Sequence, residues 1–440
     1  MNNYREKSFW LATAGDYKEN PPLKGDIKAD IAIVGGGYTG LSTAYFLKKE
    51  SPSLKVLLLE SEVIGFGASG RNAGFSMTLF GFTFSLTARV FGKEKAVEAH
   101  HYMEKAVDLV QQIVQEEKID CEYEHPGFLR VATSKRYEKR IRHEVEMVQA
   151  LGIKGIEWID KERLNNEVRS PFYRGAWWEK RCGLLNPAKM AWGMKDVILR
   201  KGVEIYEKTP VIEIKRNGKI VLKTPEGSVS ADKVVLATNA YSHLIPGLKR
   251  KQTPVFTHIV LTEPLKDKHF EEIGWRNRQG IEDARNFVHY YRLTKENRLL
   301  MGGRSISLAF GKNMDKDLNE KIFRKLEEDI KTTFPVLKDI KITHRWGGPV
   351  SVSLDLIPAI GFLGDKRIIF SLGCVGHGVS LTHMNGWTIA DLLLDKKTER
   401  TEVFFVNRKI LPMPPEPLRF AVAKAIKFAF DLQDMIYDRG

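Results

Sequence analysis

The pattern of apolar and polar positions along the chain predicts alternating strands and helices. Short apolar runs bounded by turn residues predict strands at residues 30–34, 55–60, 128–132, 203–206, 211–214, 219–222, 233–237, 257–261, 289–292, 299–304 and 368–370. Apolar positions repeated every three or four residues predict helices with one buried face over residues 93–118, 136–151 and 188–201. This alternation favours an α/β fold with two interleaved domains.

A glycine-rich motif directly follows the apolar run 30–34. Gly35 allows a tight strand-to-helix turn, Gly37 lets the backbone approach a pyrophosphate, and Gly40 lets the next helix pack closely on the strand. Phosphates bind well at such a helix N-terminus because its N–H groups are unpaired. Glu60 ends the second strand, where a carboxylate can accept hydrogen bonds from a ribose diol. The motif therefore predicts an adenine dinucleotide site; a turn that binds nothing would leave the position of Glu60 unexplained.

The composition is that of an ordinary globular protein of two or three domains, with 440 residues and 43% hydrophobic positions. The chain has no run of 18 apolar residues, and its polar N-terminus lacks the apolar core of a secretory signal, so we expect a cytoplasmic protein. Its three cysteines lie far apart, which favours free thiols over a disulfide framework or a metal site.

The formal net charge of +14 suits an anionic substrate, an anionic lipid surface or nucleic acid. Lys and Arg alternate with Asp and Glu along most helical stretches, as on solvated helix faces. Nucleic-acid binding is therefore disfavoured.

The last part of the chain differs from the rest. Four prolines between residues 412 and 417 interrupt the pattern, and an amphipathic, partly basic helix is expected over residues 418–437. This helix either docks on its own protein or contacts a membrane surface or a partner.

Four segments, taken in order, carry a resemblance to a known family: the Gly35 motif, the loop 68–74, the strand 234–239 and the late segment 373–378. Their order resembles the D-amino-acid oxidase superfamily. The loop, of sequence ASGRNAG, is similar to that of bacterial gamma-glutamylputrescine oxidases and aminophosphonate oxidases. The resemblance implies a Rossmann-like FAD-binding domain interleaved with a mixed β-sheet substrate domain. The expected ranges are 29–91, 186–240 and 340–398 for the first domain, 92–185 and 241–339 for the second, and 399–440 for the tail.

The resemblance also implies which residues contact FAD. Phosphate contacts fall to Gly35, Gly37 and Gly40, and the ribose contact falls to Glu60. Further contacts are implied in the loop beside the flavin, in the strand beside adenine and in the turn near the pyrimidine edge: Ser69, Gly70, Arg71, Asn72, Ala73, Val211, Gly376, His377, Gly378 and Val379. N–H groups of that turn can stabilise negative charge on the reduced ring.

Two of these residues have a plainer alternative, and one departure from relatives bears on the cofactor. His377 can simply hydrogen-bond its own backbone, and Arg71 can be a surface cation. Related sarcosine oxidases attach the flavin through a cysteine upstream of the late segment, but residues 347–353 contain none. We therefore expect noncovalent FAD.

The substrate side carries a weaker signal, because amine oxidation requires position and no obligatory acid or base. Tyr291, Arg304 and His258 are the candidate pocket residues, although each is equally compatible with an ordinary sheet position. Arg304 would anchor a carboxylate or phosphonate of the substrate.

The resemblance implies an FAD-dependent oxidoreductase that removes hydride from the C–N carbon of an amine or amino acid. The imine formed is hydrolysed, and O2 reoxidises the flavin with release of H2O2. One alternative is a dehydrogenase at the inner membrane face that passes electrons to a quinone or carrier, docked through the C-terminal helix. Another is a flavin-binding RNA-modification module, suggested by net charge alone.

Overall fold

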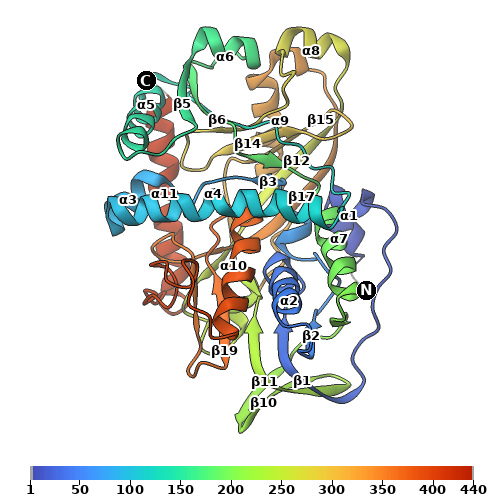
Figure 1. The fold of residues 1–440 in the computed structure, drawn as a ribbon. Coiled ribbons are helices and arrows are strands. Elements are labelled where there is room, and N and C mark those ends of the chain that lie inside the picture. The colour runs from blue at the N-terminus through green and yellow to red at the C-terminus, as the bar shows by residue number, and fades with distance from the viewer. Residues whose placement is uncertain (1–2, 439–440) are drawn as a thin grey trace.

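The computed structural model describes residues 3–438 and contains two large sheets stacked along the long axis of the molecule (Figure 1). The first sheet has the order β18-β19-β11-β1-β2-β8. Its strands are β1 (Gly25–Val34), β2 (Val56–Leu59), β8 (Glu204–Tyr206), β11 (Gly227–Leu236), β18 (Ala359–Phe362) and β19 (Ile368–Leu372). All neighbouring pairs are parallel except β18 and β19. Parallel strands need both faces covered, which explains why the second half of β1 and all of β2 are buried.

Three helices pack on or beside this sheet: α2 (Tyr38–Glu50), α7 (Pro187–Arg200) and α10 (Gly378–Leu393). Asn186 caps α7 by accepting a hydrogen bond from the backbone N–H of Lys189, and Pro187 occupies the first turn, as the sequence predicts.

An antiparallel arm, formed by β9 (Glu213–Asn217) and β10 (Lys219–Thr224), extends from β11. The sequence run 211–214 predicts that Val211 lies within a strand, but in the structure Val211 lies before β9. Pro210 precedes it and has no N–H to donate to a strand ladder.

The second sheet is mixed and has the order β16-β12-β15-β14-β13-β4-β6-β5, with β17 also paired to β12. Its strands are β4 (Phe128–Val131), β5 (Ile156–Asp160), β6 (Gly175–Glu179), β12 (Thr253–Pro264), β13 (Gly280–Asp283), β14 (His289–Leu293), β15 (Arg298–Gly303), β16 (Ser307–Leu308) and β17 (Ile342–Val352). β17 lies in the range assigned to the first domain from the sequence, yet it pairs along β12. The chain thus returns to the first sheet after residue 352.

The remaining helices surround the second sheet and the junction between the sheets (Figure 1). They are α1 (Phe9–Thr13), α3 (Phe84–Phe91), α4 (Lys93–Glu116), α5 (Lys135–Ala150), α6 (Lys161–Glu167), α8 (Asp267–Ile273), α9 (Glu320–Thr333) and α11 (Leu418–Asp438). A short two-stranded sheet joins β3 (Phe75–Ser76) to β7 (Gly183–Leu184). Within residues 3–438, none of these helices combines the length and apolar character that crossing a bilayer requires.

The C-terminal helix α11 is docked on its own protein along one face. The Asp434 carboxylate accepts hydrogen bonds from the backbone N–H groups of Asn286 and Phe287 and from the hydroxyl of Tyr137. Phe430 stacks on Phe82 with ring centroids 5.6 Å apart. This docking makes α11 part of the wall of the cavity described below.

Candidate functional site

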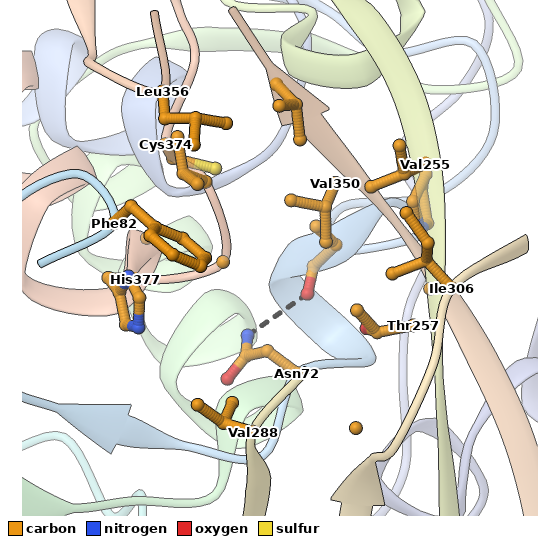
Figure 2. A pocket seen from close by; sticks show the side chains of 18 of the residues that line it. Asn72, Phe82, Val255, Thr257, Val288, Ile306, Val350, Leu356, Cys374 and His377 are labelled. Carbon is orange, nitrogen blue, oxygen red and sulfur yellow. Dashed lines mark hydrogen bonds between the residues drawn. The ribbon is translucent and has the colours of Figure 1, made fainter. Parts of the chain in front are cut away.

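The cavity lies between the two sheets and has a volume of about 330 Å³. The segments around the first sheet contribute the start of α2, the loop 68–73 and the start of α10. The second sheet contributes strand faces around Thr257 and Tyr290, and α11 contributes one side through residues such as Phe430. Figure 2 shows Asn72, His377 and apolar side chains such as Val350 around this space. Two helix N-termini therefore meet a largely apolar chamber.

The glycine turn at the start of α2 depends on close backbone contacts. Gly35 has a φ of +114°, and a Cβ there would collide with the carbonyl oxygen of Ala237. A Cβ at Gly40 would collide with the carbonyl oxygen of Gly35, so only glycine lets the helix lie this close to the strand. Gly37 lines the cavity, and a Cβ there would lie 2.9 Å from the Ser69 Oγ.

Glu60 lies at the end of β2 beside this turn. Its Oε2 accepts a hydrogen bond from the Gly36 N–H at 2.7 Å, and its Oε1 accepts one from the Glu62 N–H at 2.9 Å. Burial raises the pKa of this carboxyl above its ordinary value, and these two hydrogen bonds oppose that shift. The side chain is therefore fixed next to the glycine turn, as the dinucleotide pattern requires.

The loop 68–74 is held by its own polar side chains. The Ser69 Oγ accepts a hydrogen bond from the Tyr38 N–H at 3.0 Å, which links the loop to the first turn of α2. The side-chain amide of Asn72 donates to the Ala68 carbonyl at 3.0 Å (Figure 2). Its Oδ1 accepts a hydrogen bond from the Gly74 N–H at 2.7 Å. Ala73 accepts from the buried Arg292 at 3.3 Å. Gly70 is packed too tightly for a side chain: a Cβ there would lie 2.5 Å from the Gly65 carbonyl oxygen.

Arg71 lines the cavity and is 2% exposed. Its Nε donates to the Phe66 carbonyl at 2.8 Å, and its Nη1 lies 3.0 Å from the Asp317 carboxylate. The guanidinium carbon also lies 4.6 Å from the centroid of the Phe66 ring. Arg71 is thus a buried cation paired with Asp317, which precedes α9 beside the second sheet, and it is not a surface residue.

The turn before α10 presents free backbone donors. Gly378 and Val379 begin the helix, and no side chain caps its N-terminus. His377 donates from Nδ1 to the Gly81 carbonyl at 2.9 Å. Because a carbonyl oxygen can only accept, this contact requires the tautomer with its hydrogen on Nδ1. Burial lowers the pKa of His377 to about 4, so the ring is neutral near pH 7. Gly376 has a φ of +93° with open space where a Cβ would lie, so its conformation and not crowding favours glycine.

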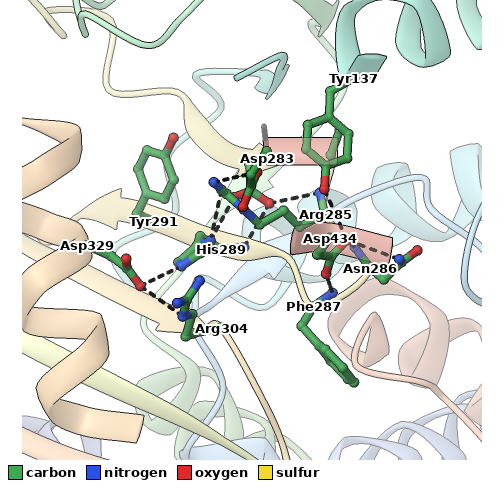
Figure 3. A network of polar contacts seen from close by, with 12 residues as sticks. Tyr137, Asp283, Arg285, Asn286, Phe287, His289, Tyr291, Arg304, Asp329 and Asp434 are labelled. Atoms are coloured by element: carbon green, nitrogen blue, oxygen red, sulfur yellow. Dashed lines mark hydrogen bonds and ion pairs between the residues drawn. The ribbon is translucent and has the colours of Figure 1, made fainter. Parts of the chain in front are cut away.

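The structure brings none of the three predicted substrate-side residues to the cavity wall. Tyr291 lies in the hydrophobic core around the second sheet, where its hydroxyl is 2.5 Å from that of Tyr173. His258 is buried with its Nε2 3.2 Å from the Lys316 carbonyl. Arg304 turns toward Asp329, with a separation of 3.4 Å (Figure 3).

Strand geometry explains which residues replace them. Successive side chains of a strand point to opposite faces of the sheet, so Tyr290 faces the cavity where Tyr291 cannot. Glu282 of β13 pairs with Tyr290 of β14 and with Arg130 of β4, and all three line the cavity. The sequence held one partial signal for this row: the charged residue Arg130 inside the otherwise apolar strand β4; Glu282 stands next to a second acid, Asp283, at the end of β13.

The residues present fit an adenine dinucleotide that ends in a flavin. The α2 turn offers backbone N–H groups to phosphates, and Glu60 offers an acceptor to the ribose. The start of α10 offers donors to a ring that becomes negatively charged on reduction. Cys374 also lines the cavity, and burial raises the pKa of its thiol.

Comparisons with known proteins agree with this geometry. A family model described as FAD dependent oxidoreductase matches residues 30–392. Gamma-glutamylputrescine oxidoreductase of Escherichia coli (strain K12) is 33% identical over 409 residues, covering 92% of this chain and 93% of the relative. Glycine oxidase from Geobacillus kaustophilus has a similar structure, with a TM-score of 0.73 and 21% identity over 87% of this chain and 100% of that chain. L-Proline dehydrogenase from P. horikoshii gives a TM-score of 0.71 and 22% identity over 87% and 96%.

Proposed function

We propose that this chain, which belongs to the family of FAD-dependent oxidoreductases, oxidises the C–N bond of a small amine or amino acid. The observation that carries the proposal is the cavity in which the FAD-binding motifs meet a chamber of the second sheet. Bound flavin supplies a two-electron acceptor for hydride from the C–N carbon. The E. coli relative is named a gamma-glutamylputrescine oxidoreductase, and the cavity here has a largely apolar wall that also carries several cationic side chains.

The protein's own residues position the substrate and exclude water. The backbone of the 68–73 loop and of the α10 start fixes one wall, and the row of Tyr290 and Glu282 fixes the opposite one. Phe82, Phe287 and Phe430 close the chamber with aromatic rings. Such a chamber can hold the reacting carbon in one orientation.

The substrate's anionic group, if it carries a carboxylate or phosphonate, is assigned to Arg140 in place of Arg304. Arg140 lines the cavity and donates to the Ala284 carbonyl at 3.2 Å. Among residues 3–438, it is the cavity-lining cation that has no carboxylate within ion-pair distance. Arginine can hold a carboxylate or phosphonate through two parallel hydrogen bonds.

The test is anaerobic bleaching of the bound flavin by amines, amino acids and aminophosphonates, each compared with an analogue whose anionic group is neutralised. The parent protein should be bleached faster by the anionic member of a pair. Arg140→Ala should lose this preference and Arg304→Ala should keep it. Bleaching by no amine would overturn the proposed function, and a preference kept by Arg140→Ala would overturn only the anchor.

Reoxidation by O2 with release of H2O2 is the proposed second half of the reaction, and oxygen consumption measures it. The alternative acceptor is a membrane quinone or carrier, which one observation favours. The outer face of α11 exposes Phe428 at 69%, together with Leu432, Met435 and Ile436. Rapid quinone reduction with slow oxygen uptake, and co-sedimentation with anionic vesicles that Phe428→Ser abolishes, would establish this alternative.

A further inference from the structure

One acidic side chain lies among several positively charged side chains on the wall of the cavity. Within residues 3–438, Glu282 is the only Asp or Glu that lines it, whereas the basic residues are Arg71, Arg130, Arg140, Arg285, Arg419 and Lys427. These positively charged side chains suit the phosphates of the cofactor and an anionic substrate group. They leave the presence of one acid unexplained.

Glu282 is 4% exposed and has no hydrogen-bond donor from the part of the chain that the structure describes. Arg130 is its neighbour across the strand pair, but the guanidinium of Arg130 binds the Glu144 carboxylate at 2.8 Å. The side-chain oxygens that are fully enclosed and unpaired do not include those of Glu282, so its carboxylate faces the open cavity, where a ligand can reach it. A ligand that enters the cavity can therefore supply the donor that the described residues do not.

A second buried acid provides a direct comparison. Glu179 is also 4% exposed, but its carboxylate accepts hydrogen bonds from Thr78 at 2.7 Å and Trp177 at 3.4 Å. It lines a smaller neighbouring cavity and not the main one. A buried acid with a purely structural role is expected to accept hydrogen bonds from the protein, as Glu179 does. Glu282 is equally buried but accepts none from the described residues.

We propose that Glu282 receives the amino group of the substrate, which is an amine that enters the cavity as its ammonium ion. The carboxylate accepts a hydrogen bond from the ammonium and then takes its proton. One N–H bond breaks, its electron pair stays on nitrogen, and an O–H bond forms on the Glu282 carboxyl. The neutral amine can then release hydride from its carbon. This inference rests on the proposed function.

The electrostatic surroundings suit this transfer. Burial raises the pKa of Glu282 to about 7, Arg130 opposes the rise and Asp283 adds to it. Tyr290 of β14 and Cys182 before β7 interact with it electrostatically. Glu282 lines both cavities, and the other titratable groups on their walls include Arg140, Arg285 and His377 in the main cavity and Glu144, Glu179 and His100 in the smaller one. A carboxyl group with a pKa near 7 is about half deprotonated at neutral pH, so it can accept a proton there and release it again.

The experiment compares Glu282→Gln with Glu179→Gln in the FAD-loaded protein. In the parent, kcat/KM for anaerobic flavin bleaching by the best amine of the panel should fall as pH drops below about 7, because the base becomes protonated. Glu282→Gln should raise KM roughly ten- to hundredfold and remove this acidic limb. Glu179→Gln should keep both the KM and the limb.

A binding measurement separates this role from catalysis. tert-Butylammonium has no hydrogen on the carbon that bears nitrogen and cannot be oxidised, so calorimetry reports its affinity alone. Its Kd should rise about tenfold in Glu282→Gln and stay unchanged in Glu179→Gln, while uncharged tert-butanol should bind all three proteins equally.

Three outcomes would overturn the assignment of Glu282: no binding of tert-butylammonium to the parent, equal binding to Glu282→Gln, or an acidic limb that survives in Glu282→Gln. A parent protein that no amine bleaches would overturn the proposed function itself.

Discussion

At the scale of single residues, the glycine turn makes the sharpest demand on the sequence. Gly37→Val should abolish FAD binding and Gly37→Ala should weaken it, because the added Cβ meets the Ser69 Oγ at 2.9 Å where the backbone must approach the pyrophosphate. The flavin absorbance of the purified protein reports occupancy. Gly67→Ala is the matched control, since its Cβ would meet nothing closer than 3.7 Å. Full occupancy in Gly37→Val would contradict the assignment.

Glu60 carries the second residue-scale prediction. Glu60→Ala should raise the dissociation constant for FAD by roughly one to two decades, because hydrogen bonds to a charged group are worth about 1.5–3 kcal/mol. Fluorescence titration of the apoprotein with FAD measures this. Glu62→Ala removes a nearby acid that pairs with Lys208 and should leave the affinity unchanged. An unaltered constant in Glu60→Ala would exclude the ribose contact.

The residue scale also shows how far the sequence can predict the site. The expected family, the FAD cofactor and the α/β fold with a C-terminal helix are confirmed. The FAD-side residues lie within local motifs, so spacing alone identifies them as candidates. The substrate side depends on which face of a strand a residue occupies, and a one-residue difference separates Tyr290 from Tyr291. Arg304 leaves its strand with a φ of +67°, which no periodicity predicts.

At the scale of elements, a buried ionic network joins β13 and β14 to α9 and, through Arg285, to α11 (Figure 3). His289 lies 2.7 Å from Asp283 and 2.9 Å from Asp329. Burial lowers the pKa of His289, but the two carboxylates raise it more, to about 9. Protonated His289 therefore stabilises the hairpin at neutral pH.

The network predicts a pH dependence of the free energy of unfolding. Since the folded pKa of about 9 exceeds the unfolded value of about 6.5, this stabilisation is complete below pH 6.5 and is lost as pH rises through 9. Its size is up to about 3 kcal/mol. Urea unfolding between pH 6 and pH 10 should show the loss in the parent and not in His289→Gln. His101→Gln changes an exposed histidine and should retain the parental profile.

At the scale of the whole molecule, one acid joins the two sheets beside the cavity. Asp317 precedes α9, which packs on the second sheet, and it pairs with Lys7 and with Arg71 of the loop 68–74 beside the first sheet. Asp317→Ala should lower the free energy of unfolding by about 3–5 kcal/mol, because it leaves the Arg71 guanidinium buried without its partner. It should also release FAD at a lower temperature. Urea unfolding and flavin fluorescence on heating measure both effects, and Asp315→Ala, an exposed neighbour, should alter neither.

The order in which the chain is made gives the docking of α11 a further meaning. Every other wall of the cavity comes from residues before 418, so the ribosome completes this side last. During synthesis the chamber is open along the groove that Phe430 later fills. A cofactor can therefore enter through this side before α11 docks, and the helix then covers it, so assembly with FAD can take place while the chain is still being synthesised.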